Sequence, residues 1–149
     1  MTSDEKDKKQ VTSDGRSSSA VSGKLDPNSY RDLVVWQKGI SLVKEVYKLT
    51  GAFPSEEKFG LGSQMRRAAV SIPSNIAEGQ ARRTTGEFIQ YLSHAEGSRA
   101  ELDTQFVIAL ELGYCPVARA QLAIELLDEI RRMLNGLRRK LASGRAVHR

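Results

Sequence analysis

Apolar residues recur along most of the chain at the three- and four-residue spacing of an amphipathic helix. The pattern predicts four helices: residues 30–50, a second that begins within 55–63 and ends at about Glu78, a third from Thr84 to Gly113, and a fourth from Pro116 to Ser143. No segment has the strict alternation that is typical of a half-buried strand. The chain is therefore expected to be all-α.

Local start and stop signals support these bounds. Ser29 is placed to cap the first helix, and Thr84, with a glutamate three residues later, forms a capping box for the third. Gly51 is expected to end the first helix in the left-handed conformation, and Gly113 is expected to end the third. Helices joined by such short loops pack most simply as an antiparallel up-down four-helix bundle.

The chain divides into three parts on this pattern. Residues 1–29 are rich in Ser, Lys, Asp, Gly and Thr and hold only scattered apolar residues, too few to offset the entropy of ordering the backbone. We expect a disordered polar tail there and a bundle domain over residues 30–143. Ser143 and Gly144 are expected to end the last helix, which leaves 144–149 as a frayed basic terminus.

The stretch "RRAAVSIPSNIAEG" at residues 66–79 interrupts the second helix with polar residues and a proline. A helical wheel places the apolar residues of this region on one stripe and a set of polar residues on another. Pro73 lacks an N–H and is expected to kink the helix. The polar stripe indicates either hydrogen bonds within the bundle or between subunits, or a binding surface bordered by arginines; its members are Ser71, Ser74, Asn75 and Glu78.

Positive charge is concentrated toward the carboxyl end. The net charge is +5, residues 1–29 carry no net charge, and residues 130–149 hold seven basic side chains and no acidic one. A basic helix face is often only solvated surface, but neutralising phosphates with counterion release is the main source of nucleic-acid affinity. The candidate nucleic-acid-binding residues are Arg66, Arg67, Arg82, Arg83, Arg131, Arg132, Arg138, Arg139 and Lys140.

Few aromatic residues accompany these arginines, so stacking on single-stranded bases is not indicated. Contacts to the shape and backbone of structured RNA fit better. The third and fourth helices are also apolar around much of their circumference, as "FVIAL" at 106–110 and "LAIELL" at 122–127 illustrate. A lone bundle would leave part of this surface exposed, which favours self-association.

Residues that would indicate an enzyme are scarce in the sequence. His94 has no partner at a metal-binding spacing, Cys115 has no basic or histidine neighbour that would support a nucleophile, and the glycines of "KFGLGSQ" lack a phosphate-loop lysine. Glu78 and Glu87 are the only carboxylates near the arginine-rich turn, and they do not stand at a metal-bridging spacing, which argues against a nuclease. We therefore expect no catalytic residues, no metal and no cofactor.

The apolar segments are shorter than the roughly 18 residues that a membrane span needs, and the amino terminus lacks the apolar stretch of a secretory signal. A cytoplasmic protein with no membrane partner is therefore expected. The single cysteine excludes an internal disulfide.

Several motifs in order resemble one family: "DLVVWQKG" at 32–39, "QMRRAAVSIPSNIAEGQAR" at 64–82, "EFIQYLSHAEGSRAEL" at 87–102 and "LGY" at 112–114. They are similar to the four-helix-bundle proteins encoded in the intervening sequences of bacterial 23S ribosomal RNA genes. That family includes the accessory variability protein of diversity-generating retroelements. The resemblance covers residues 31 to about 141. It implies a ring-shaped homopentamer with a basic surface and, for the retroelement branch, binding to a reverse transcriptase and its RNA.

Two functional hypotheses follow. The first is a non-enzymatic, homo-oligomeric helical bundle that binds structured nucleic acid, with RNA favoured, through the basic residues given above. The second is a protein-interaction scaffold or accessory subunit that docks a partner such as a reverse transcriptase, with no direct contact to nucleic acid. The motifs do not choose between the branches of the family.

Overall fold

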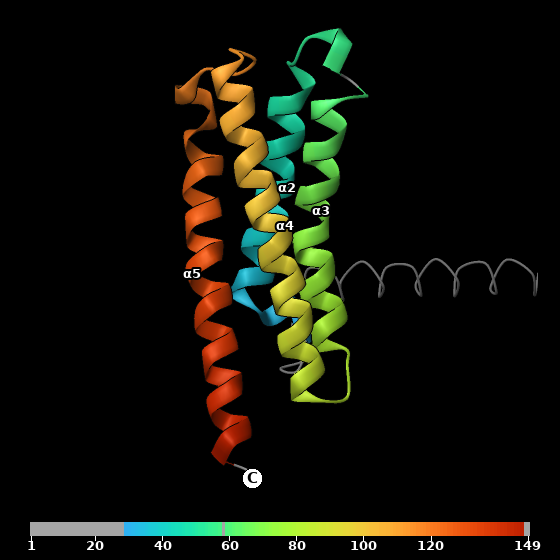
Figure 1. Cartoon of the computed structure of the whole chain (residues 1–149), viewed down its shortest axis with the longest axis vertical. Coiled ribbons are helices and arrows are strands. Elements are labelled where there is room, and N and C mark those ends of the chain that lie inside the picture. Colours follow the sequence, from blue (N-terminus) through green and yellow to red (C-terminus); the bar gives the residue numbers. More distant parts are fainter. Residues whose placement is uncertain (1–28, 58, 148–149) are drawn as a thin grey trace, which may run out of the picture.

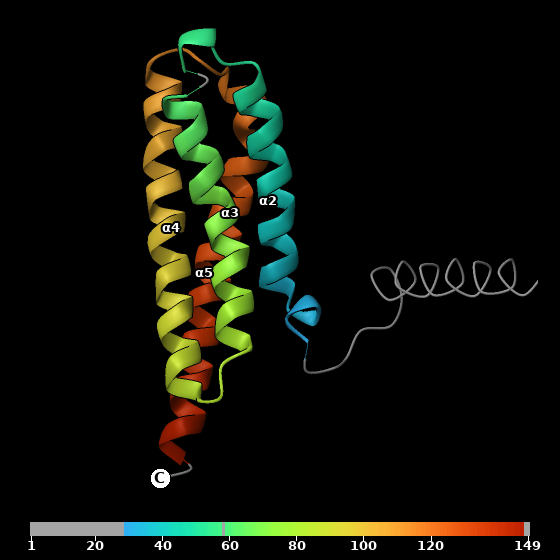
Figure 2. The same cartoon turned by 90° about the vertical axis from the view of Figure 1, so that its right-hand side faces the viewer.

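The computed structural model describes residues 29–57 and 59–147, and the described part is all-helical. Four long helices, α2 (Val34–Gly51), α3 (Leu61–Gln80), α4 (Thr85–Glu111) and α5 (Val117–Val147), run alternately up and down (Figures 1 and 2). Each packs against its neighbours in sequence, and α5 returns to α2 to close the bundle. The predicted four-helix fold is confirmed. The tail predicted over 1–29 lies outside the described residues except for Ser29.

The first helix starts later than the sequence pattern predicts. Tyr30–Asp32 form a separate 3-10 turn, η1, and Leu33 is extended with ψ at 122° before α2 begins. Ser29 caps this short turn by accepting a hydrogen bond from the Arg31 amide, and so it does not cap α2. The side chain of Gln37 donates to the Arg31 carbonyl, which fixes the break from the α2 side.

The predicted left-handed stop is wrong at Gly51 and confirmed at Gly113. Gly51 is the last helical residue of α2, and the chain leaves through Ala52, whose amide donates to Leu49. Gly113 has φ at +74°, and the Tyr114 amide donates back to the Ala109 carbonyl, as in a Schellman motif. Thr84 caps α4 as predicted, by accepting from the Glu87 amide at 3.1 Å.

The second helix, predicted to end at about Glu78, continues through the buried Gly79 to Gln80. A Cβ at Gly79 would lie 2.7 Å from the Tyr91 Cβ, so the glycine permits close contact between α3 and α4. The second 3-10 turn, η2 (Ser55–Glu57), precedes α3. Gly60 stands at the N-cap position of α3 and makes no side-chain capping bond, and the Glu57 carboxylate accepts from the Leu61 amide instead.

Pro73 is buried inside α3, which remains helical on both sides of it. Its ring faces Gly39 of α2, where an added Cβ would meet the Pro73 Cβ at 3.3 Å. The proline therefore serves as a packing surface for α2, while the kink expected there stays a prediction. The apolar stripe predicted beside it is confirmed, because Met65, Ala69, Ile72 and Ile76 are fully buried.

The last helix extends further than expected. α5 runs through Ser143 and Gly144 to Val147 instead of ending at those residues. Its C-terminal turns (red) reach past the loop between α3 and α4 (Figure 1). Its buried side is an apolar stripe that includes Ala123, Leu127, Ile130 and Leu134, and this stripe packs the helix into the bundle.

Candidate nucleic-acid interface

The nine candidate basic residues do not form one surface. Arg66 and Arg67 lie in the second turn of α3, whereas Arg82 and Arg83 follow the end of that helix. At about 1.5 Å per residue, roughly 20 Å of helix separates the two pairs. Because α5 runs in the same direction as α3, its last turns reach the end of the bundle where Arg82 and Arg83 lie (Figure 1).

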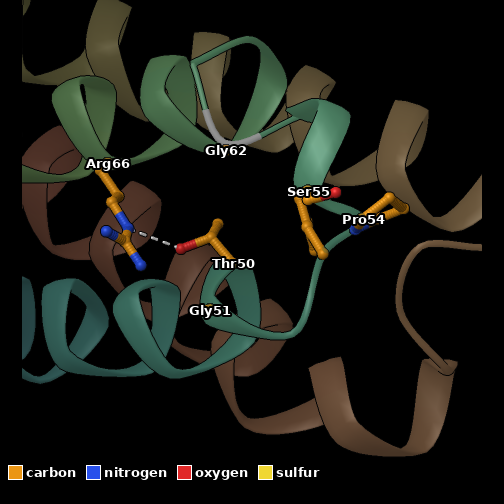
Figure 3. Close-up of a pocket in the computed structure, with 7 residues that line it drawn as sticks. Thr50, Gly51, Pro54, Ser55, Gly62 and Arg66 are labelled. Atoms are coloured by element: carbon orange, nitrogen blue, oxygen red, sulfur yellow. Dashed lines mark hydrogen bonds between the residues drawn. The ribbon is translucent and has the colours of Figure 1, made fainter.

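Arg66 is held against α2 by three contacts. Its Nε donates to the Thr50 hydroxyl at 2.8 Å, its Nη2 donates to the Tyr47 carbonyl at 3.3 Å, and its guanidinium carbon lies 4.4 Å from the centre of the Tyr47 ring. Figure 3 shows Arg66 reaching from α3 toward Thr50 across a hollow of about 300 Å³ beside Ser55 and Gly62. The guanidinium is therefore oriented by α2, and no acid in the described part of the chain pairs with it.

Arg131 and Arg132 share one carboxylate. Asp128 accepts from Arg131 at 2.8 Å and pairs with Arg132 at 3.1 Å. The hydrogen bond from Arg131 is the largest cause that lowers the pKa of Asp128 below its usual value, followed among the lowering causes by the charges of the two arginines. Counting acids only within residues 130–149 therefore overestimated the unpaired positive charge of α5, because Asp128 lies one helical turn before Arg131 and pairs with it.

The remaining basic residues lie at the end of the bundle that holds both the α3–α4 loop and the C-terminal half of α5 (Figure 1). Arg138 donates to the Asn135 side chain at 3.3 Å, and Arg82 lies over the Tyr91 ring at 4.8 Å and donates to its hydroxyl. Within the described part of the chain, no acid pairs with any of these residues, although Glu87 is exposed in the first turn of α4. We call this set the basic end; it comprises Arg82, Arg83, Arg138, Arg139 and Lys140.

The basic end has a shallow hollow beside α5. Ile89 from α4 lines it with Asn135, Arg138, Arg139 and Ala142 from α5. Arg139 is exposed and Arg138 half-buried. Arg138 and Arg139 of α5 therefore lie beside the first turns of α4, which directly follow the loop that contains Arg83.

The polar stripe of α3 is divided between packing and solvent. The Ser71 and Ser98 hydroxyls are 2.8 Å apart, which joins α3 to α4, and Asn75 donates to both the Ser71 carbonyl and its hydroxyl. Ser74 and Glu78 are exposed. Half of the stripe thus makes hydrogen bonds within the bundle, as one of the two interpretations predicted.

Tyr47, Tyr91 and Asp128, which orient or neutralise the arginines, were not singled out by sequence analysis. Tyr47 and Tyr91 lie nineteen and nine residues from the arginines they contact. Helical periodicity relates residues three or four apart on one helix, so contacts between helices and across a loop are invisible to it. Asp128 is at helical spacing from Arg131 and Arg132, and this spacing could have identified it.

Within residues 29–57 and 59–147, no group of three or more His, Cys, Asp or Glu side chains could hold a metal ion. His94 packs against the Tyr91 ring at a centroid distance of 5.9 Å. Cys115 is buried, and burial raises the pKa of its thiol, which disfavours the reactive thiolate. Among the described helices, none is both long and apolar enough to cross a membrane.

The model of the 23S rRNA-intervening sequence protein family matches residues 31–136. The chain belongs to this family. The match spans α2, α3, α4 and most of α5, and therefore includes both arginine pairs of α3 and its following loop. It leaves Arg138, Arg139 and Lys140 just beyond its end.

Among solved structures, the bundle is similar to a protein of unknown function from the S23 ribosomal protein family of Bacteroides thetaiotaomicron. The TM-score is 0.66 at 21% identity, and the similarity covers 71% of this chain and 96% of that one. At this identity the likeness supports the fold alone. No curated protein matches the chain significantly.

Proposed function

We propose that this family member is a non-enzymatic helical bundle that binds the phosphate backbone of structured RNA through its basic end. The observation that carries the proposal is that Arg82 and Arg83 of the α3–α4 loop lie at the same end of the bundle as Arg138, Arg139 and Lys140 of α5 (Figure 1), with no paired acid among the described residues. Arg66 and Arg67 lie near the other end, and Asp128 compensates Arg131 and Arg132, so these four contribute less.

The arrangement favours backbone contacts over base reading. The Tyr91 ring at this end is already covered on one face by Arg82. Guanidinium groups bind phosphate oxygens in a bidentate manner, and a rigid helix holds Arg138 and Arg139 at a fixed separation. Double-stranded RNA presents its phosphates in a regular geometry, so a hairpin is the appropriate ligand for a test.

The test compares two double variants of α5 in binding to a fluorescent RNA hairpin over a series of salt concentrations. Arg138→Gln with Arg139→Gln removes two basic-end charges, and Arg131→Gln with Arg132→Gln removes the same charge from the same helix. We expect the first to lower the slope of log affinity against log salt by about 1.8, which is about 0.9 for each lost phosphate contact. The second is expected to change it by less than half as much.

Equal changes for both double variants would refute the basic end as the binding site, since only net charge would then matter. Wild-type affinity that does not depend on salt would refute phosphate binding altogether. The four substitutions do not change the apolar core, because positions 131, 132 and 139 are exposed and Arg138 is half-buried. Both variants should therefore unfold like the wild type.

Self-association is the second part of the proposal. Large apolar side chains are more than 40% exposed on the outer sides of α4 and α5, as expected from the sequence; they are Val107, Ile108, Leu112, Val117 and Leu122. Covering such surface with another copy of the chain would remove it from water. The pentamer implied by the family resemblance, and the reverse transcriptase as a partner, stay expectations that sedimentation and copurification would test.

A further inference from the structure

A groove on the outer side of α3 lies away from the basic end. It has a volume of about 610 Å³ and is bounded by Tyr47 of α2, Phe59 of the preceding loop, and side chains from the first three turns of α3. We call it the α3 groove. The α3 residues that matter here are Ser63, Arg66, Arg67 and Val70.

The α3 groove combines exposed apolar surface with arginine. Tyr47 is 45% exposed, Val70 is 41% exposed and Phe59 is 89% exposed. Among the residues that the structure describes, no lysine, aspartate or glutamate lines it. Aromatic residues and arginine are enriched at protein–protein interfaces, whereas lysine and the acidic residues are depleted there. The lining therefore has the composition of a protein-docking surface.

The two arginines of the α3 groove play different parts. Arg66 is held in place by Thr50 and the Tyr47 carbonyl, so little side-chain entropy would be lost when it binds a ligand. Arg67 is exposed and, within the described part of the chain, has no hydrogen-bond or ion-pair partner. A carboxylate entering the groove would find one oriented and one adaptable guanidinium on adjacent residues.

We propose that the α3 groove docks a short segment of a partner protein that carries carboxylates next to a large aromatic or aliphatic side chain. Charge complementarity calls for carboxylates on the partner, because the described lining of the groove has two arginines and no acid. Val70, Phe59 and the exposed part of Tyr47 require the apolar group, since a large side chain seated there would be removed from water. Arginine beside an apolar pocket is also typical of binding hot spots.

A nucleic acid fits this surface less well. Phosphates gain nothing from Val70, and one face of the Tyr47 ring, the natural platform for a base, is covered by Arg66. The proposal is independent of RNA binding at the basic end, which uses different residues near the opposite end of the bundle. Either proposal can fail while the other stands.

The test begins with the full chain and a library of random peptides displayed on phage. We expect the selected sequences to share aspartate or glutamate adjacent to Phe, Trp, Leu or Ile. A synthetic peptide with that consensus is then titrated against Arg67→Glu and Val70→Ser, and each substitution should weaken binding by about tenfold or more, the loss typical of a hot-spot residue.

The matched control is Arg119→Glu, which makes the same charge change at an exposed arginine in the first turn of α5. It lies on the helix diagonal to α3, because α3 contacts α2 and α4. We expect this variant to bind the peptide as the wild type does. All variants must retain the wild-type circular dichroism spectrum and thermal transition.

Four results would overturn the proposal. Selected peptides without acids, or equal weakening by Arg67→Glu and Arg119→Glu, would exclude the α3 groove as an acidic-peptide site. A change of oligomeric state in Arg67→Glu, measured by sedimentation, would assign the groove to a second copy of the chain. Loss of hairpin RNA binding in Arg67→Glu, with Arg138→Gln and Arg139→Gln without effect, would assign it to nucleic acid.

Discussion

Gly79 lies against α4 with no room for a Cβ, and replacing it with alanine should destabilise the bundle. The new Cβ would stand 2.7 Å from the Tyr91 Cβ, 2.9 Å from a ring carbon of Phe88 and 3.3 Å from the Phe88 carbonyl oxygen. Ordinary contacts between carbon atoms are at about 3.5–4.0 Å. The Phe88 ring can rotate away, but the Tyr91 Cβ and the Phe88 carbonyl are fixed to the α4 backbone, so the helices must separate.

The magnitude follows from two opposed effects. Overpacking a buried position costs about 1–3 kcal/mol, while exchanging glycine for alanine inside a helix gains about 1 kcal/mol. Gly79 is the residue before the last of α3, where the gain from helix propensity is smaller. We therefore expect Gly79→Ala to lower the free energy of unfolding by about 1–2 kcal/mol.

Gly136 and Gly97 provide matched controls. Both lie in helix interiors, and a Cβ added at either meets no atom within 4 Å. Alanine there should raise the free energy of unfolding by about 0.5–1 kcal/mol. The assay is urea unfolding followed by far-ultraviolet circular dichroism at one fixed protein concentration, since self-association would shift the midpoint. Stabilisation by Gly79→Ala equal to that of Gly136→Ala would refute the close contact between α3 and α4.

Two other predictions concern buried groups of α4 and the following loop. Arg99 is 8% exposed and bidentate to Glu96, whose hydrogen bond raises the Arg99 pKa, so Glu96→Gln should lower the free energy of unfolding by about 1–3 kcal/mol. Glu45→Gln removes a carboxylate of similar exposure whose partner, Lys48, is exposed, and it should change the free energy of unfolding by less than about 0.5 kcal/mol. Equal effects in urea unfolding would contradict the burial argument. Burial raises the Cys115 pKa, so its alkylation by iodoacetamide should be slower than that of the unfolded chain and should accelerate at a higher pH than for a free thiol. An unfolded-like rate in the native protein would count against it.

Features decided by short-range chemistry could be predicted from the sequence. The Thr84 cap and the Gly113 stop each depend on backbone groups within a few residues, and both were found as predicted. The stripe that contains Ile72 depends only on helical spacing, and it is buried. The all-α bundle follows because these local signals agree along the chain.

Features decided by contact between helices could not be predicted. Gly79 resembles a helix stop, yet it permits Phe88 and Tyr91 of α4 to approach, and only the packed structure reveals this use. Pro73 resembles a helix breaker, yet its ring packs against Gly39 of the neighbouring helix. In both cases the residue that explains the exception is far away in sequence, where neither propensity nor periodicity carries information.

The same distinction determines what each arginine can do for a ligand. An arginine paired with a carboxylate, such as Arg131 with Asp128, must give up that attraction before it binds a phosphate or another acid. Arg82 is instead oriented by a tyrosine ring and hydroxyl, which leave its charge uncompensated and reduce the entropy lost on binding. Arg66 is oriented in the same way by Tyr47 at the other end of the bundle. Among the described residues, each end therefore carries one arginine held by an aromatic side chain beside an unpaired one, and this repeated arrangement is consistent with the two separate binding surfaces that we propose.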